Sequence, residues 1–170
     1  ADEVLTMMRL KTGELLGFAA AAGAALGCGR LPGEDARVDA LEEFAALCGV
    51  AFQLQDDILG VTGNEHRLGK PVGADLREGK ATLIVLHALA HGDPAGRERL
   101  LAVLGNRSAD PEAVAEAGAW LAACGGVEHA ARLARTMLGR ATERLRDALP
   151  ASDARDLLLA LAESMVARSA

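Results

Sequence analysis

The chain has 170 residues, a formal net charge of −6 and a pI near 5.2. This acidic balance argues against nucleic acid as the main partner, because phosphate backbones are bound by basic surfaces. The length suits a single domain over residues 1–170. Alanine and leucine are abundant and only 2% of the residues are aromatic, so helices packed through small residues are expected.

The three cysteines, Cys28, Cys48 and Cys124, lie far apart in the sequence. An odd number without C-x-x-C spacing predicts neither a disulfide framework nor a zinc site. Reduced, buried thiols in a cytoplasmic protein are the simplest expectation. No basic segment followed by an apolar one opens the chain, so no signal peptide is predicted.

Apolar residues at helical spacing predict one helix over residues 2–28. Within it, the weakly polar run Leu15–Cys28 has 14 residues, whereas a membrane span needs roughly 20. A core helix that does not span a membrane is therefore expected. The same helix carries Lys11 and Thr12, and taken alone such a pair is most simply a solvated surface lysine beside a threonine.

A second helix is predicted from residue 34 or 35 to about residue 61. Its first half is rich in acids that are expected to form a solvated face: Glu34, Asp35, Asp39, Glu42 and Glu43. Its second half is almost wholly apolar until Gln53, which shares one helical face with Asp56 and Asp57. Burying unpaired carboxylates is costly, so a partner is expected to neutralise these two acids. The alternative is a frayed helix end with hydrated acids.

Residues 62–79 are predicted to form a glycine-rich loop. At 18 residues the loop is too long for a simple connector, and long ordered loops are usually functional. It suits a lid that closes over a substrate and excludes water. Lys70 and Lys80 are candidates for binding phosphate, and Asp75 for orienting a lysine or a metal-bound water. Acids on a helix and amines on a nearby loop are what a Mg²⁺–diphosphate site needs.

After residue 80, five further helices are predicted and no strand pattern occurs. Asp93–Pro94 and Asp110–Pro111 are typical of a cap followed by a first helical turn. The expected helices cover residues 81–91, 94–104, 111–123 and 127–149, and a last one is capped by Ser152 or Asp153. The sequence therefore predicts an all-α fold.

Residues 52–80 resemble the second aspartate-rich region of the trans-isoprenyl diphosphate synthases, also called polyprenyl synthetases. The positions that agree are Phe52, Gln53, Asp56, Asp57, Gly69, Lys70, Pro71, Gly73, Asp75, Leu76, Gly79 and Lys80. One position departs, because the third aspartate of that region falls on Gly60, which removes one carboxylate from the metal face. Lys11 and Thr12 match the Lys-Thr pair with which the family contacts an allylic diphosphate.

The resemblance implies a helical bundle of the isoprenoid synthase type and a Mg²⁺-dependent prenyltransferase. The complete enzyme would condense isopentenyl diphosphate with an allylic diphosphate, while Mg²⁺ and lysines stabilise the departing diphosphate. In that scheme Asp56 and Asp57 hold Mg²⁺. The implied catalytic residues are Lys11, Lys70 and Lys80, and they bind the substrate together with Thr12 and Gln53.

The first aspartate-rich region of that family does not occur in the chain, which therefore looks like the C-terminal half of a synthase. An N-terminal half is then expected in the same polypeptide or in a partner chain, and residues 1–170 alone are expected to have little activity. The family resemblance also implies a homodimer. Two alternatives remain, a terpene cyclase-like diphosphate enzyme and a non-catalytic regulatory small subunit. The run Gly69–Leu76 favours chain elongation, and the retained acids and lysines argue against the subunit.

Overall fold

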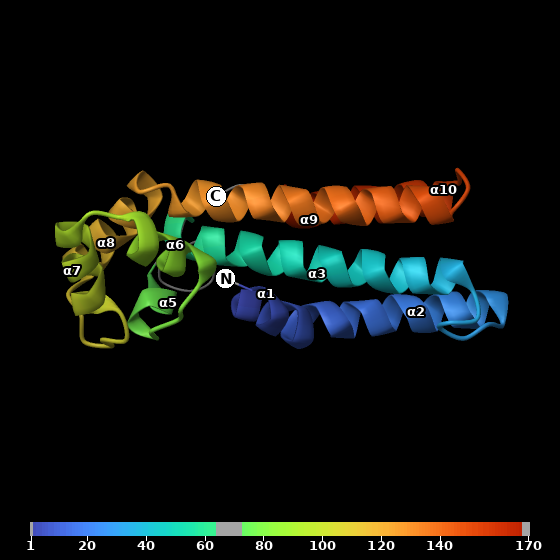
Figure 1. Ribbon diagram of the computed structural model, residues 1–170, viewed down its shortest axis with the longest axis horizontal. Helices are drawn as coiled ribbons and strands as arrows, with labels where there is room; N and C mark the ends of the chain where they lie inside the picture. Colours follow the sequence, from blue (N-terminus) through green and yellow to red (C-terminus); the bar gives the residue numbers. More distant parts are fainter. Residues whose placement is uncertain (1, 64–72, 168–170) are drawn as a thin grey trace. The chain divides into compact units, whose positions relative to one another are not determined.

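A computed structural model describes residues 2–63 and 73–167. Those residues form helices and no strands, which confirms the predicted all-α fold (Figure 1). The helices are α1 (Asp2–Met8), the π-helical turn η1 (Arg9–Gly13), α2 (Glu14–Cys28), α3 (Ala36–Thr62), α5 (Ala74–Arg77), α6 (Leu83–His91), α7 (Pro94–Val103), α8 (Pro111–Ala123), α9 (Gly126–Ala148) and α10 (Asp153–Val166).

The described residues gather into two compact units. We call Gln55–Arg132 unit 1, and Asp2–Leu54 together with the described residues from Leu133 onward unit 2. Helices α3 and α9 contribute residues to both units. Each unit has a hydrophobic core of its own.

The core of unit 2 lies where α3, α9 and α10 pack together. Phe44, Leu47 and Cys48 come from α3, and Ala141 and Leu145 come from α9. On the other side of α3, glycines let the segment η1–α2 approach closely. Small residues at such contacts bring helix backbones together, as the alanine-rich composition suggests.

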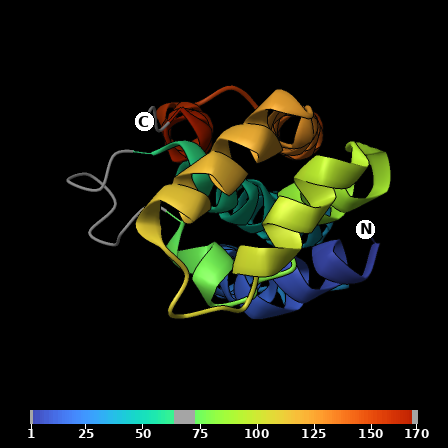
Figure 2. The same cartoon turned by 90° about the vertical axis from the view of Figure 1, so that its left-hand side faces the viewer.

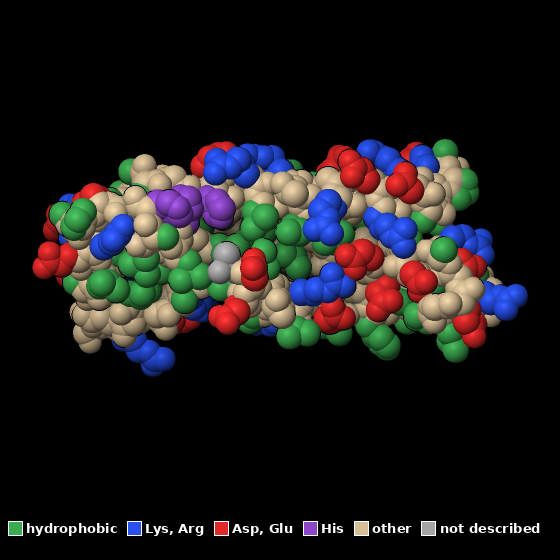
Figure 3. Space-filling model, viewed as in Figure 1, with side chains coloured by type: hydrophobic (Ala, Val, Ile, Leu, Met, Phe, Trp, Pro, Cys, Tyr) green, Lys and Arg blue, Asp and Glu red, His purple; other side chains and the backbone are tan. Residues whose placement is uncertain are grey.

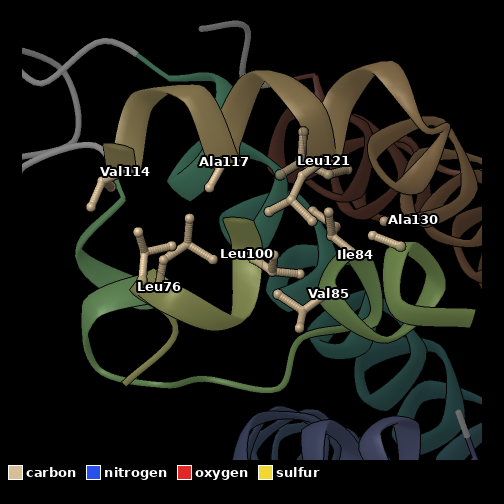
Figure 4. Packing of buried hydrophobic residues seen from close by; sticks show 11 residues of the cluster. Leu76, Ile84, Val85, Leu100, Val114, Ala117, Leu121 and Ala130 are labelled. Carbon is tan, nitrogen blue, oxygen red and sulfur yellow. The ribbon is translucent and has the colours of Figure 1, made fainter. Parts of the chain in front are cut away.

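The core of unit 1 is built from short helices around the end of α3. In Figure 2, the green α5 and α6 and the yellow-to-orange α7 and α8 face the viewer. The labelled side chains of Figure 4 converge from these helices and the start of α9: Leu76, Ile84, Val85, Leu100, Val114, Ala117, Leu121 and Ala130. This core fixes α5 beside the C-terminal end of α3.

Side-chain caps begin the short helices where the sequence predicts them. Asp93 accepts a hydrogen bond from the Gly96 amide at 2.8 Å, and its other oxygen accepts one from Trp120 Nε1 at 2.8 Å. Asp110 accepts one from the Glu112 amide at 3.1 Å. Capping of this kind satisfies amides that have no partner within the helix. Both Asp-Pro predictions are therefore confirmed.

Two local predictions were wrong. The segment 2–28 is not one regular helix, because the π-turn η1 interrupts it. Within the described part of the predicted loop 62–79, residues Ala74–Arg77 form the helical turn α5. Neither feature could be predicted from the spacing of apolar residues. A π-turn adds only one residue to a helical turn, and a four-residue helix is too short to show a period.

The apolar segment of α2 is also less buried than a core helix should be. Only Gly17 and Ala21 are buried in α2, whereas Leu15, Phe18 and Leu26 are 70%, 69% and 88% exposed. By length and composition alone, α3 could cross a membrane, but 67% of its most apolar window is buried inside the structure. Such burial is typical of the core helix of a globular protein.

Candidate functional site

The acidic end of α3 lies in unit 1 and emerges from the core. Leu54 is fully buried, Asp56 is half-buried and Asp57 is only 8% exposed. A carboxylate this deeply buried must be compensated by hydrogen bonds or by a cation. Asp57 is therefore held in place by its surroundings and is not a hydrated acid at a frayed helix end.

A second buried carboxylate stands against the same helix. Asp75, on α5, is 7% exposed, and its Oδ2 would lie 2.7 Å from a Cβ atom placed on Gly60. The Gly73 amide donates to the Gly60 carbonyl at 3.2 Å, which ties the start of α5 to α3. Gly60 therefore leaves the space that the Asp75 carboxylate occupies. A side chain at position 60 would therefore require the Asp75 carboxylate to move.

Lys80 forms ion pairs with Asp75 and with Glu78. Its Nζ lies 2.5 Å from Asp75 Oδ1 and 3.0 Å from Glu78 Oε2, and its backbone amide donates to the Asp75 carbonyl at 3.0 Å. The hydrogen bond to Asp75, and then that to Glu78, raises the pKa of the Lys80 ammonium above its ordinary value. Lys80 thus keeps its positive charge, and Asp75 orients a lysine as the sequence suggested.

The remaining predicted residue of the loop is Lys70, which lies outside the described residues. Arg77, on α5, donates to the Ala109 carbonyl at 3.4 Å. Its guanidinium therefore supports the connection before α8.

The predicted Lys-Thr pair lies in unit 2 on the π-turn η1. Lys11 is exposed, and the Thr12 hydroxyl donates to Gln53 Oε1 at 3.4 Å. The structure thus brings together two of the predicted substrate-binding residues, Thr12 and Gln53, from segments that are 41 residues apart. An open hollow of about 610 Å³ runs along α1 and η1, and Met7, Leu10 and Lys11 are among the residues that line it.

Two residues without a predicted functional role hold this turn. Arg9 donates from Nη2 to Glu43 Oε2 at 2.8 Å and from Nη1 to Glu43 Oε1 at 3.3 Å. Glu43 was expected to belong to a solvated face, but it is half-buried because it receives this two-pronged contact. The pairing of an arginine with one acid among five could not be read from spacing alone.

The oxygen donors of unit 1 fit a hard divalent cation. Asp56 and Asp57 are adjacent on a rigid helix, and Mg²⁺ binds carboxylates while keeping water and phosphate oxygens as its other ligands. Among the described residues, no three histidine, cysteine or acidic side chains are placed to hold a metal by themselves. A phosphate group could supply further oxygen ligands to such a cation.

Curated proteins of known activity match this chain over nearly its whole length. The short chain isoprenyl diphosphate synthase of Methanothermobacter thermautotrophicus is 40% identical over 167 residues, which cover 98% of this chain and 49% of the relative. The geranylgeranyl diphosphate synthase of Methanosarcina mazei is 36% identical and covers 98% and 48%. The chain thus spans about half the length of the curated relatives it matches.

A solved structure extends the similarity to the fold. The polyprenyl synthase of Caulobacter crescentus, crystallised with calcium and isoprenyl diphosphate, has a TM-score of 0.87 with this chain. The two are 34% identical, and the match covers 98% of this chain and 49% of that one. The family model described as polyprenyl synthetase matches residues 1–121. This match covers more than half of the chain, and the chain therefore belongs to the polyprenyl synthetase family.

Proposed function

We propose that this chain binds the Mg²⁺–diphosphate group of an allylic substrate in a prenyltransferase that condenses it with isopentenyl diphosphate. The observation that carries the proposal is a pair of buried carboxylates: Asp57 at the end of the apolar helix α3, and Asp75 on α5, which forms an ion pair with Lys80. Relatives that cover nearly the whole chain are named isoprenyl or geranylgeranyl diphosphate synthases. They favour chain elongation over a cyclase or a non-catalytic subunit.

The acids and the lysines have separate roles in this proposal. Asp56 and Asp57 would hold Mg²⁺, which supplies positive charge next to the phosphate oxygens when it is bound. Lys80 donates hydrogen bonds to the diphosphate, and Asp75 holds its ammonium in the required direction. Lys70, outside the described residues, is proposed for the same task.

Lys11, Thr12 and Gln53, which all belong to unit 2, are proposed to bind substrate. The exposed ammonium of Lys11 suits a diphosphate oxygen, and the Thr12 hydroxyl is oriented by Gln53. The apolar side chains in the hollow beside Lys11 suit a hydrocarbon tail. Fixed donors aimed at a leaving group stabilise the negative charge that develops as its bond breaks.

The chain is proposed to need a further polypeptide segment for turnover. Figure 3, in the view of Figure 1, has green apolar side chains along the edge formed by α2, where Leu15, Phe18 and Leu26 are exposed. Uncovered apolar residues of this size favour a covering partner. A homodimeric cytoplasmic enzyme that includes a second half is the assembly we propose.

Calorimetric titration of the chain with inorganic pyrophosphate, with and without Mg²⁺, tests the proposal. We expect binding that requires Mg²⁺, and a loss of at least about tenfold in affinity, or 1.4 kcal/mol, for Asp57→Asn. The isosteric amide keeps the volume of the buried side chain and removes its charge. Glu163→Gln on α10 is the matched control, because this acid is exposed, loses the same charge and is not one of the candidate residues. Equal affinities for the wild type and Asp57→Asn would refute the proposal.

A further inference from the structure

The π-turn η1 is closed by two parallel bonds over the same pair of residues. The Glu14 amide donates to the Arg9 carbonyl, which is the five-residue step that defines a π-turn. The side chains of these two residues also meet, because Arg9 Nε donates to Glu14 Oε1 at 2.8 Å. The backbone hydrogen bond and the side-chain hydrogen bond thus join the same two residues, Arg9 and Glu14.

This side-chain pair distinguishes a π-turn from an α-helix. In an α-helix, residues five apart are separated by about 140° around the axis and do not face each other. In a π-turn the residue five positions on lies above the first, as the fourth does in an α-helix. The Arg9–Glu14 contact is therefore stabilising in the π-turn and would be lost in a regular helix.

The same guanidinium also attaches the turn to α3. The two contacts from Arg9 to Glu43 form a fork that fixes the direction of the guanidinium plane. Close by, Gly13 packs directly on α3, since a Cβ atom placed on it would lie 2.8 Å from the Ala46 carbonyl oxygen. The turn is therefore held by an ion-pair network at its start and by backbone contact at its end.

We propose that Arg9 is a positioning residue that selects the π-turn and so directs Lys11 and Thr12. Without the Arg9 contacts, a regular helix would compete with the π-turn. That change shifts the helical register by one residue, or about 100° of rotation. Thr12 would then leave Gln53, and Lys11 would point in another direction. The effect of Arg9 on diphosphate binding rests on the proposed function. Its effect on the geometry of the π-turn does not.

The experiment uses the whole chain in four forms: wild type, Arg9→Gln, Glu14→Ala and Arg37→Gln. Arg9→Gln removes all three bonds of the guanidinium. Glu14→Ala removes only the pair that is specific to the π-turn, at an exposed position where folding should persist. Arg37→Gln is the matched control, since it removes the same charge from an exposed ion pair with Asp35 in the same unit.

Two readouts are measured on each form. The first is the nuclear Overhauser effect between the Thr12 methyl group and the Gln53 side-chain amide, which reports the register directly. The second is the affinity for pyrophosphate in the presence of Mg²⁺. We expect Arg9→Gln and Glu14→Ala to weaken the Thr12–Gln53 signal and Arg37→Gln to retain it. Affinity should fall on the order of tenfold in Arg9→Gln.

The outcomes separate this proposal from the proposed function. An unchanged Thr12–Gln53 signal in both Arg9→Gln and Glu14→Ala would overturn the role of Arg9. If the Arg9 and Glu14 variants lost the Thr12–Gln53 signal, Arg9 would be upheld as the residue that selects the π-turn. If the wild-type chain also bound no pyrophosphate, the proposed function would be refuted independently.

Discussion

The acidic end of α3 in unit 1 and the π-turn in unit 2 use glycine in opposite ways. In unit 1, Gly60 leaves space that a buried carboxylate, that of Asp75, fills. In unit 2, Gly13 and Gly49 leave no space at all, since a Cβ atom on Gly49 would lie 2.8 Å from the Gly13 Cα atom. One glycine accommodates a charge, and the other two bring backbones into contact.

The charged groups of the two regions also differ in their exposure to solvent. Asp57 and Asp75 are buried, so their positions are set by the packing around them. Lys11 is exposed, so its direction depends on the backbone turn that carries it. Buried acids can be fixed by side-chain contacts, whereas an exposed lysine on a flexible stem has to be directed from its backbone.

The largest expected effect comes from breaking the backbone contact in unit 2. Gly49→Ala should lower the free energy of unfolding by about 3 kcal/mol, because the added methyl group meets backbone atoms that cannot rotate away. Urea denaturation monitored by circular dichroism measures the change. Gly23→Ala is the control, since nothing lies within 4 Å of its Cβ position, and alanine there should stabilise the helix by roughly 0.5–1 kcal/mol. If both substitutions had the same effect, the close approach of Gly13 and Gly49 would be contradicted.

A smaller effect is expected from filling the space at Gly60. Gly60→Ala should cost about 1 kcal/mol in unfolding free energy, because the methyl group meets the end of the Asp75 side chain and not the backbone. The displaced carboxylate should also release Lys80, so binding of Mg²⁺–pyrophosphate should weaken. Gly118→Ala is the control in the same unit, because its Cβ position has only an ordinary contact, 3.9 Å from the Val61 carbonyl oxygen. Unaltered pyrophosphate affinity in Gly60→Ala would show that Asp75 and Lys80 do not act together.

Much of the fold could be predicted from the sequence because its signals are local. Asp93 and Asp110 cap the helices that follow them, and the apolar run before Asp56 predicts a buried helix. The position of Asp75 against Gly60 could not be predicted, since the two residues lie on different helices and their contact depends on how α5 packs.

The π-turn could not be predicted from the sequence for a different reason. A five-residue turn among small and apolar residues leaves the helical pattern of 2–28 intact, and the pairing of Arg9 with Glu14 only has meaning once the turn is known. The resemblance to a known family indicated Lys11 and Thr12. The roles of Arg9 and Glu14 could be recognised only from the three-dimensional structure.

The central claim is that the acids at the end of α3 hold a divalent cation with a diphosphate. Nuclear magnetic resonance with Mn²⁺ in place of Mg²⁺ tests it most directly, because the paramagnetic ion broadens the amide signals of residues near it. With pyrophosphate present, trace Mn²⁺ should broaden the signals of Asp56, Asp57 and Gly60 first, and Asp57→Asn should abolish that preference. Broadening confined to acids that precede α3, such as the exposed Glu34, would contradict the account.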